Sequence, residues 1–341
     1  MHGTPEARAL HAQFPAIDLH ADSLMWSRWV GYDLHERHEP MLPLAALGGH
    51  VDVPRLVEGG VGAQFFGLVS LPIGQRRGLA AVVDEQIDLL EQAALAQPDR
   101  LVKARTAEDI EAARARGAVA ALLGIEGAHA LEGELDTLER FARRGVRYLG
   151  LCHFSANDVC YPAYGRGRRD GEGLTPFGRD VVRRAEDLGV IVDLAHINRA
   201  GFLEVCALAR RPPIVSHTGV AGAFDHWRNI DDEQLRALAD RGGCAGIIFC
   251  PLYLGGNGLA PVVKHLLHII NVAGEDTPAL GSDWDGFIVP TRELRDAAHL
   301  PLLTDALLQA GLSERVIGKL LRGNAMRILR DNPLPTQRSV A

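Results

Sequence analysis

The sequence predicts an α/β protein with the architecture of a TIM-like (β/α)8 barrel, and three observations support that prediction. The chain has 341 residues, a length that one such barrel fills. Eight short apolar runs alternate with stretches of helical composition. The first run ends in His-Ala-Asp-Ser rather than in a glycine-rich phosphate loop, which disfavours the alternative of an open, doubly wound sheet.

Each predicted strand is a run of apolar or β-branched residues that polar residues terminate. In chain order the runs cover residues 16–19, 62–69, 119–125, 147–151, 190–194, 213–215, 244–249 and 278–280. Strands that alternate with helices pair in parallel. We therefore expect the carboxyl ends of all eight to open on one face of the barrel.

The predicted helices lie between these runs, and several begin with the capping residues Thr, Asp or Gly. They include residues 79–96, 106–116, 135–144, 178–188 and 231–241. No internal repeat and no Pro/Ser-rich linker divides the sequence, so we expect residues 1–341 to form one domain. The polar segment 161–173 is predicted to be a loop over the barrel mouth, with arginines that are either solvated or turned to an anionic substrate.

Composition excludes several classes of protein. With 47% hydrophobic and 23% charged residues, the chain can bury a large core, unlike a disordered or collagen-like chain. A formal net charge of −7 argues against nucleic acid as a partner. The five cysteines form no CxxC pair, which predicts neither a disulfide framework nor a cysteine zinc site. Because no signal peptide or membrane span is recognisable, we expect a cytoplasmic protein without a membrane partner.

Seven imidazole or carboxylate side chains lie at the ends of the predicted strands. Because parallel strands of a barrel end on one face, we expect these side chains to lie close together. Histidine and carboxylate ligands in such a group are typical of a metal site. The residues are His20, Asp22, Glu126, His153, His196, His217 and Asp283.

The spacing His20-Ala-Asp22 places two ligand types on the same side of a strand, where both can reach one ion. The same spacing recurs in His50-Val-Asp52. That second motif lies in a glycine-opened loop before a helix, so we expect a structural role for it.

Glu126 ends an apolar strand and is flanked by glycines that leave room for a ligand. A buried carboxylate needs a compensating cation, and the surrounding histidines favour a metal over an arginine. His20, Asp22, His196, His217 and a carboxylate able to bridge exceed the three protein ligands of an ordinary catalytic zinc site. The residues therefore predict two zinc ions and a bridging hydroxide as the nucleophile.

Three further groups are predicted to handle protons and substrate. Asp283 is the expected general base, with Asp285 as the second candidate. Arg228 is expected to hold a carboxylate through a bidentate pair, and an exposed surface arginine is the alternative. Tryptophans near the motifs are expected to serve packing rather than substrate contact. They are Trp26, Trp29 and Trp227.

The sequence resembles the renal (membrane) dipeptidase family of metallopeptidases, a branch of the amidohydrolase-type barrels. The resemblance covers most of the chain. It is carried by the segments DLHAD (18–22), GGHVDVPRLVEGGVGAQFF (48–66), GIEGAHAL (124–131), GVRYLGLCHFSAND (145–158), LTPFGRDVVRRAEDLGVIVDLAHIN (174–198), PIVSHTGV (213–220), WRNIDDE (227–233), GSDWDG (281–286) and GNAMRIL (323–329).

The resemblance implies a zinc-dependent dipeptidase that binds two Zn²⁺ ions per chain. One ion would be held by His20, Asp22 and Glu126 and the other by Glu126, His196 and His217, with Glu126 bridging. The resemblance further implies three roles outside the ligand set. His153 would orient the scissile carbonyl, Arg228 would bind the free carboxylate of the dipeptide, and Asp283 would transfer protons and recognise the amine. It also implies a homodimer and a dipeptide substrate, with a D-residue possible at its C-terminal position.

Two alternatives to a dipeptidase stay open at this point. The same metal centre could act on an N-acyl amino acid, a lactam or an ester, because loops such as 161–173 vary independently of a metal core. The chain could also be a catalytically silent, metal-binding interaction protein. A structural zinc site would not need His153, Arg228 and Asp283, so this last alternative is the less favoured.

Overall fold

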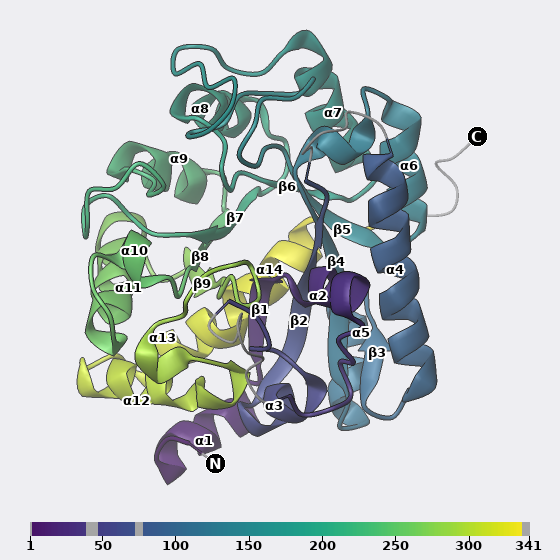
Figure 1. Ribbon diagram of the computed structural model, residues 1–341. Coiled ribbons are helices and arrows are strands. Elements are labelled where there is room, and N and C mark those ends of the chain that lie inside the picture. Colours follow the sequence, from purple (N-terminus) through teal and green to yellow (C-terminus); the bar gives the residue numbers. More distant parts are fainter. Residues whose placement is uncertain (1, 39–46, 72–77, 336–341) are drawn as a thin grey trace.

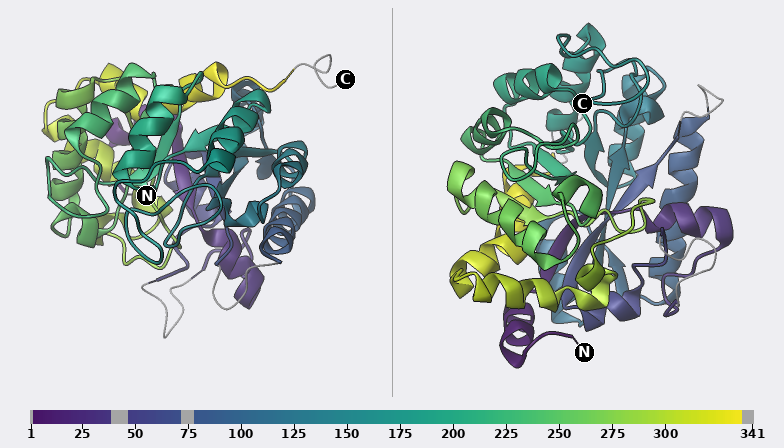
Figure 2. Two further views of the ribbon diagram at one scale, coloured as in Figure 1. Left: turned by 90° about the horizontal axis from the view of Figure 1, so that it is seen from above. Right: turned by 60° about the vertical axis from the view of Figure 1, so that its left-hand side comes forward.

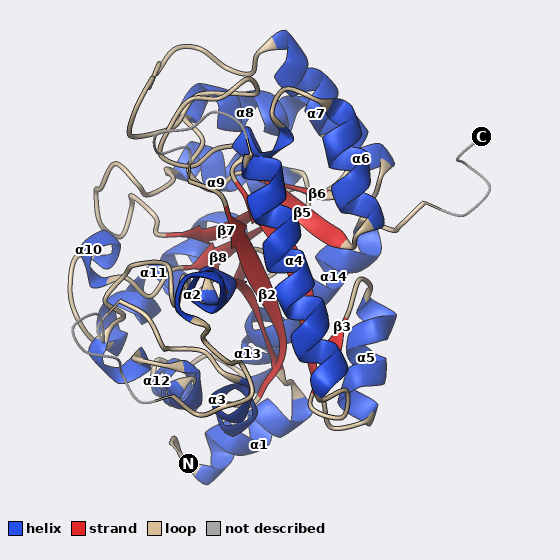
Figure 3. Cartoon of the chain, turned by 45° about the vertical axis from the view of Figure 1, so that its right-hand side comes forward, coloured by secondary structure: helices blue, strands red, loops and turns tan. Residues whose placement is uncertain are grey.

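The computed structural model describes residues 2–38, 47–71 and 78–335. Within these residues, nine parallel strands form one sheet, and eight of them close into a ring in the order β1, β2, β4, β5, β6, β7, β8, β9. Helices surround these strands (Figures 1 and 3). The predicted (β/α)8 barrel is therefore confirmed.

The strands are β1 (Ala16–Ala21), β2 (Val61–Val69), β3 (Leu101–Lys103), β4 (Val119–Glu126), β5 (Val146–Gly150), β6 (Ile191–Asp193), β7 (Ile214–Thr218), β8 (Cys244–Ile247) and β9 (Pro278–Leu280). All eight predicted strands correspond to strands of the ring. The sequence analysis missed β3, which pairs with the first residues of β4 and lies outside the ring. Only its first residue, Leu101, is buried and the strand ends in Lys103, so it lacks the continuous apolar run that marks the other strands.

The helices are α1 (Pro5–Gln13), α2 (Ser23–Val30), α3 (Val53–Glu58), α4 (Leu79–Ala96), α5 (Ala107–Ala115), α6 (Leu135–Arg143), α7 (Pro176–Asp187), α8 (Arg199–Leu208), α9 (Asp232–Asp240), α10 (Pro251–Leu254), α11 (Leu259–Ala273), α12 (Pro301–Gln309), α13 (Glu314–Gly318) and α14 (Asn324–Asp331). Short 3-10 turns η1 (Ala128–Leu131), η2 (Arg292–Leu294) and η3 (Ala297–His299) and one π-helical turn η4 (Lys319–Gly323) complete the set.

Capping residues fix where the predicted helices begin. Thr106 and Asp231 each form a capping box at the start of α5 and α9. Helix α7 begins at Pro176, two residues before the predicted start, because Thr175 caps it and proline is favoured at the first helical position.

A cluster of buried side chains fills the ring of strands. Every ring strand contributes to it, so it lies inside the barrel, and it continues into residues of α5 and α14. Its members include Ile17, Phe65, Leu122, Tyr148, Ile191, Ile214, Cys244 and Ala279. Burial of this apolar surface stabilises the barrel and makes it a rigid support for the strand ends.

The predicted loop 161–173 contains no helix or regular strand and is tied down by isolated bridges, such as the one between Pro162 and Ile197. In Figure 1 and the right view of Figure 2, the teal chain around this loop lies at the opposite end of the molecule from α1. Arg168 pairs with Asp170 and Arg169 pairs with Glu172. The two arginines are thus neutralised locally, as the prediction of a solvated face expects.

Candidate metal centre

The seven predicted ligand-type residues gather at the carboxyl ends of the barrel strands. Each is buried, and each belongs to the end of a different strand except for the first two, which share β1. The residues are His20 and Asp22 at β1, Glu126 at β4, His153 beyond β5, His196 beyond β6, His217 in β7 and Asp283 beyond β9. The convergence that the sequence predicted is therefore present.

Glu126 lies at the centre of this group. Its Oε1 atom is 3.1 Å from Nε2 of His196, 3.5 Å from Nε2 of His217 and 3.8 Å from Nε2 of His20. Its Oε2 atom is 3.6 Å from Nε2 of His153. One carboxylate therefore faces ring nitrogens with both of its oxygens.

Several polar atoms of the group are crowded together. Nε2 of His196 and Nε2 of His217 are 2.9 Å apart. Nε2 of His20 lies 3.2 Å from Oδ1 of Asp22, and neither of these buried atoms has a well-aligned hydrogen bond in the part of the chain that is described. Buried polar atoms without partners are costly, and a cation would satisfy them. This donor set fits the metal ions that the sequence predicted.

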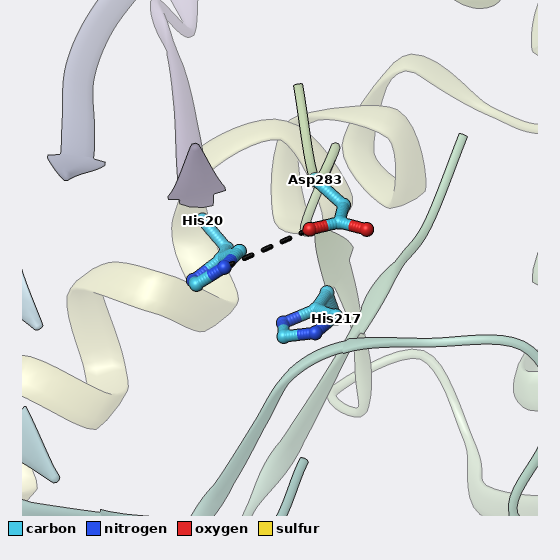
Figure 4. A group of neighbouring side chains, drawn as sticks. All are labelled: His20, His217 and Asp283. Atoms are coloured by element: carbon cyan, nitrogen blue, oxygen red, sulfur yellow. Dashed lines mark ion pairs between the residues drawn. The ribbon is translucent and has the colours of Figure 1, made fainter. Parts of the chain in front are cut away.

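Three members of the group are shown as sticks in Figure 4. His20, His217 and Asp283 come from separate strand ends and point toward one another. The rings of His20 and His217 are stacked with centroids 4.2 Å apart, and Oδ1 of Asp283 is 3.7 Å from Nε2 of His20.

Burial and mutual repulsion change the ionisation of the carboxyl groups. Burial, followed by the nearby charge of Asp22, raises the pKa of Glu126 well above its usual range. Burial raises the pKa of Asp283 to about 8. Carboxylates crowded in this way repel one another and favour a bound cation.

The imidazoles respond to burial in the opposite direction. Burial lowers the pKa of His196 and His217 well below the usual range and that of His153 to about 3. For His20, burial acts to lower the pKa, but the carboxylates, Asp22 first, outweigh it and raise the pKa to about 10. Neutral imidazole is the form that binds metals, so His196 and His217 are ready to act as ligands.

Two glycines make room for this group. A Cβ atom at Gly67 would lie 2.0 Å from Oδ1 of Asp22, and one at Gly124 would lie 1.9 Å from the ring of Tyr148. The Tyr148 hydroxyl in turn is 2.7 Å from Nδ1 of His20. The sequence analysis missed Tyr148. Its signal was weak, because a tyrosine inside a barrel strand is more often part of the core.

Left-handed backbone conformations aim several of these side chains. His196 has φ of 65° and Asp283 has φ of 61°, and Asp285 and Phe287 follow with φ of 67° and 58°. Non-glycine residues adopt this region rarely, and each such residue costs on the order of 1–3 kcal/mol. The surrounding hydrogen bonds must offset that cost. Sequence patterns do not reveal which residues adopt this conformation.

Asp285, the second candidate for a general base, lies outside the group. Its carboxylate accepts hydrogen bonds from the Ser23 hydroxyl at 2.5 Å and from the main-chain N–H of His50 at 2.7 Å. It therefore ties the start of α2 to the loop that contains His50. Asp52 caps α3 through the main-chain N–H of Arg55, which confirms the structural role expected for the second His-x-Asp motif.

Arg228 is buried beside the group rather than exposed on the surface. One of its Nη atoms donates to the main-chain carbonyl of His217 at 2.8 Å, and burial lowers the pKa of its guanidinium. Arg228 and His196 both line a cavity of about 380 Å³. A positive charge next to the ligands can bind an anionic part of a substrate.

The three tryptophans differ in environment. Trp26 is buried and donates its indole N–H to the carbonyl of Asp285, so it packs as expected. Trp29 is partly exposed and contacts Phe287. Trp227 is also partly exposed, stacks on Tyr164 and lines the same cavity as Arg228, so the expectation of pure packing does not describe it.

The sequence matches the family described as "Membrane dipeptidase (Peptidase family M19)" over residues 4–338. The chain belongs to this membrane dipeptidase family. Dipeptidase tcpJ of Claviceps purpurea is 33% identical over 315 residues, which cover 89% of this chain and 73% of that protein. As a family member, the chain is a metal-dependent hydrolase that acts on dipeptides.

Solved structures of dipeptidases share its fold. A metallo peptidase from Rhodobacter sphaeroides, liganded with a phosphinate mimic of the dipeptide L-Ala-D-Ala, superimposes with a TM-score of 0.86 at 26% identity, over 94% of this chain and 99% of that one. Dipeptidase AC, an M19 metallo peptidase, has a TM-score of 0.84 at 28% identity, over 94% and 98% of the two chains.

The family name includes the word membrane. Within the described residues of this dipeptidase, no helix combines the length and the apolar character that crossing a bilayer requires.

Proposed function

We propose that this dipeptidase holds two zinc ions per chain and that Glu126 bridges them. His20 and Asp22 would complete one site, and His196 and His217 would complete the other. The observation that carries this proposal is the position of Glu126, whose Oε1 atom lies 3.1–3.8 Å from the Nε2 atoms of all three histidines. The buried Nε2 of His20 and Oδ1 of Asp22, which lie 3.2 Å apart and have no well-aligned hydrogen bond among the described residues, support it.

Bound zinc would supply Lewis-acid polarisation of the scissile carbonyl and would make a water molecule acidic near neutral pH. The chain's own residues would then position the substrate and move protons. Asp283, whose pKa burial raises to about 8, can exchange a proton near neutral pH, first with water and then with the leaving amine. His153 is neutral, and its ring N–H can donate to the carbonyl oxygen of the substrate.

Arg228 would bind the free carboxylate of the dipeptide. Its burial next to His217, in the wall of the cavity, supports this role because a desolvated guanidinium binds a carboxylate strongly. The dipeptide mimic bound to the Rhodobacter sphaeroides relative supports L-Xaa-D-Xaa dipeptides as a substrate class for this chain too. A cytoplasmic location and a homodimer stay predictions.

The test begins with metal analysis of protein purified without chelator, followed by a hydrolysis assay on the same sample. The panel contains L-Ala-L-Ala, L-Ala-D-Ala, an N-acyl amino acid and a lactam. We expect about two zinc ions per chain and release of free amino acids from dipeptides. Two ions with hydrolysis of the acyl compound or lactam alone would overturn the substrate assignment. One ion or none after zinc reconstitution would overturn the metal assignment.

Replacing Arg228 tests the substrate carboxylate separately. We expect Arg228→Met to lower kcat/KM for dipeptides by about 10- to 100-fold, the cost of a lost charge-assisted hydrogen bond. Arg228→Lys keeps the charge but loses the fork of donors, so its kcat/KM should lie between those of the wild type and Arg228→Met. A dipeptide with an amidated C-terminus should be a poor substrate for the wild-type enzyme and should respond little to either change. Equal loss on both substrates would contradict the role.

A further inference from the structure

Two buried aspartate–serine pairs of matching geometry lie just below the metal-ligand group. In the first, Asp193 of β6 accepts the main-chain N–H of Ser216 at 2.7 Å on Oδ1 and the Ser216 hydroxyl at 2.7 Å on Oδ2. In the second, Asp18 of β1 accepts the N–H of Ser282 at 2.8 Å on Oδ1 and its hydroxyl at 2.6 Å on Oδ2. Each serine directly precedes a residue of the group.

The two pairs differ in what else the serine hydroxyl contacts. Oγ of Ser216 lies 2.9 Å from Nδ1 of His217. Oγ of Ser282 instead lies near main-chain atoms, the carbonyl of His20 at 3.0 Å and the N–H of Trp284 at 3.2 Å. Only the first pair therefore reaches an imidazole through its hydroxyl.

The direction of the Ser216 hydroxyl proton determines the tautomer of the His217 ring. A hydroxyl has one proton, and Oδ2 of Asp193 is the acceptor that takes it. While the Asp193 carboxyl is ionised, Ser216 Oγ can only accept from His217, so the proton of the neutral ring sits on Nδ1. Burial raises the pKa of the Asp193 carboxyl, and donors from Ser216 and Ala195 work against that rise.

We infer that Asp193 and Ser216 are positioning residues that hold His217 in its Nδ1–H tautomer. The Nε2 atom then keeps its lone pair, which faces Oε1 of Glu126 at 3.5 Å. This inference rests on the proposed function in one respect, since it gives His217 the role of a metal ligand. Outer partners of ligand histidines fix both the ring orientation and the tautomer, and losing one costs about 10- to 100-fold in metal affinity.

The matched variants are Ser216→Ala and Ser282→Ala. Both remove a buried hydroxyl that donates to an aspartate on a neighbouring strand, so both are expected to lower the stability of the barrel. Only Ser216→Ala removes a partner of an imidazole. Ser70→Ala serves as the baseline, because the Ser70 hydroxyl is buried at the end of β2 and has no hydrogen-bond partner among the described residues.

The first readout is the tautomer of His217, measured in metal-free protein labelled with ¹⁵N-histidine by long-range ¹H–¹⁵N NMR. His217→Asn assigns the signal. We expect the Nδ1–H form in the wild type, in Ser282→Ala and in Ser70→Ala, and a shift toward the Nε2–H form in Ser216→Ala. An Nε2–H ring in the wild type would overturn the inference.

The second readout is zinc retention against a series of chelators of increasing strength. We expect Ser216→Ala to lose one of its zinc ions to chelators whose zinc affinity is about 10- to 100-fold lower than that of the chelators needed for Ser282→Ala and Ser70→Ala. Equal retention in Ser216→Ala and Ser282→Ala would show a merely structural role and overturn the inference. A wild type that binds no zinc would instead contradict the proposed function and leave the tautomer result to decide the positioning role.

Discussion

Two cavities at opposite ends of the barrel strands differ in how their charges are paired. The cavity at the mouth has a volume of about 380 Å³ and includes His196 and Arg228. The cavity at the base, next to α1 and η4, has a volume of about 450 Å³ and includes Arg322 and Lys319. Size therefore does not single out the active site.

The base cavity is rich in cations, and three of them pair with a carboxylate. Arg322 lies 2.9 Å from Glu111, Lys319 lies 2.8 Å from Asp276 and Arg315 lies 2.7 Å from Glu275. At the mouth, by contrast, the Nε2 atoms of His196 and His217 lie 2.9 Å apart, and both face the same carboxylate oxygen of Glu126. Buried polar groups that satisfy one another stabilise a fold, and those that do not require a ligand. The difference in pairing, rather than the difference in volume, marks the functional end.

The largest expected effect comes from the mouth. Glu126→Gln removes the charge of the proposed bridging ligand, so we expect kcat/KM for dipeptides to fall by more than about a hundredfold, beyond the usual loss for an outer partner. Because the Glu126 carboxylate crowds Asp22 and Asp283, the metal-free variant should at the same time unfold at a higher urea concentration than metal-free wild type.

The control for Glu126→Gln is Glu186→Gln. Glu186 is also buried, but its carboxylate accepts hydrogen bonds from Arg210 and from the N–H of Arg211. We expect this change to lower stability and to leave metal content unchanged. Lower stability of metal-free Glu126→Gln would contradict the prediction that crowded carboxylates at the barrel mouth destabilise the metal-free protein.

The next effect comes from the base of the barrel. Arg147 of β5 is fully buried and donates to the main-chain carbonyls of Gly189 and, at 2.8 Å, Asn332. Burial lowers its pKa to about 10, so it remains charged at neutral pH. We expect Arg147→Met to reduce the free energy of unfolding by about 3 kcal/mol, because two buried carbonyls lose their donor.

Urea unfolding measures this loss, and Arg183→Met is the matched control because the exposed Arg183 side chain pairs, among the described residues, with Asp180 alone, one turn away. Metal content and kcat per folded Arg147→Met molecule should stay close to wild type. A large fall in kcat without loss of stability would show that the two ends of the barrel are not separable.

The smallest effect is a pH dependence at the base. His11 of α1 is buried against the Thr304 hydroxyl at 2.8 Å, and burial lowers its pKa from 6.5 to about 4. Between pH 4 and pH 6.5, His11 is protonated in the unfolded chain and neutral in the folded chain. The stability that the neutral ring contributes is therefore present above pH 6.5 and is lost as the pH falls toward 4.

At pH 5, the titration of His11 should cost about 2 kcal/mol relative to pH 7. His11→Gln cannot titrate and keeps a polar atom near Thr304, so its unfolding free energy should fall less over the same range. The comparison uses metal-free proteins, because acid also releases metal ions. Parallel pH profiles of the two proteins would contradict the prediction.

The fold followed from local patterns to a large extent. The apolar runs at 62–69 and 119–125 coincide with β2 and β4 within one residue, because buried parallel strands are continuous apolar segments. Strand β3 was missed because only Leu101 is buried and Lys103 interrupts the apolar run. The start of α7 shifted because a cap and a proline, not apolar spacing, set it.

The site was predictable as a set of residues but not as an arrangement. Ligand types at strand ends revealed His20, Glu126 and His217, since barrel geometry sends every strand end to one face. The same reasoning offered Asp285 as a base. In the structure its carboxylate accepts hydrogen bonds from Ser23 and His50 and has a structural role. Both Asp283 and Asp285 have a left-handed backbone, and no pattern in the sequence predicts it.

The sequence by itself determined the order of strands and helices, the strand ends at which ligands stand and the family to which the chain belongs. These depend on periodicity, capping and residue type, which are local properties of the chain. Only the tertiary structure decided that Tyr148 contacts His20, that Arg228 is buried beside His217 and that Ser216 links His217 to Asp193. Those contacts join residues from different strands or loops, and packing around a closed ring sets their distances.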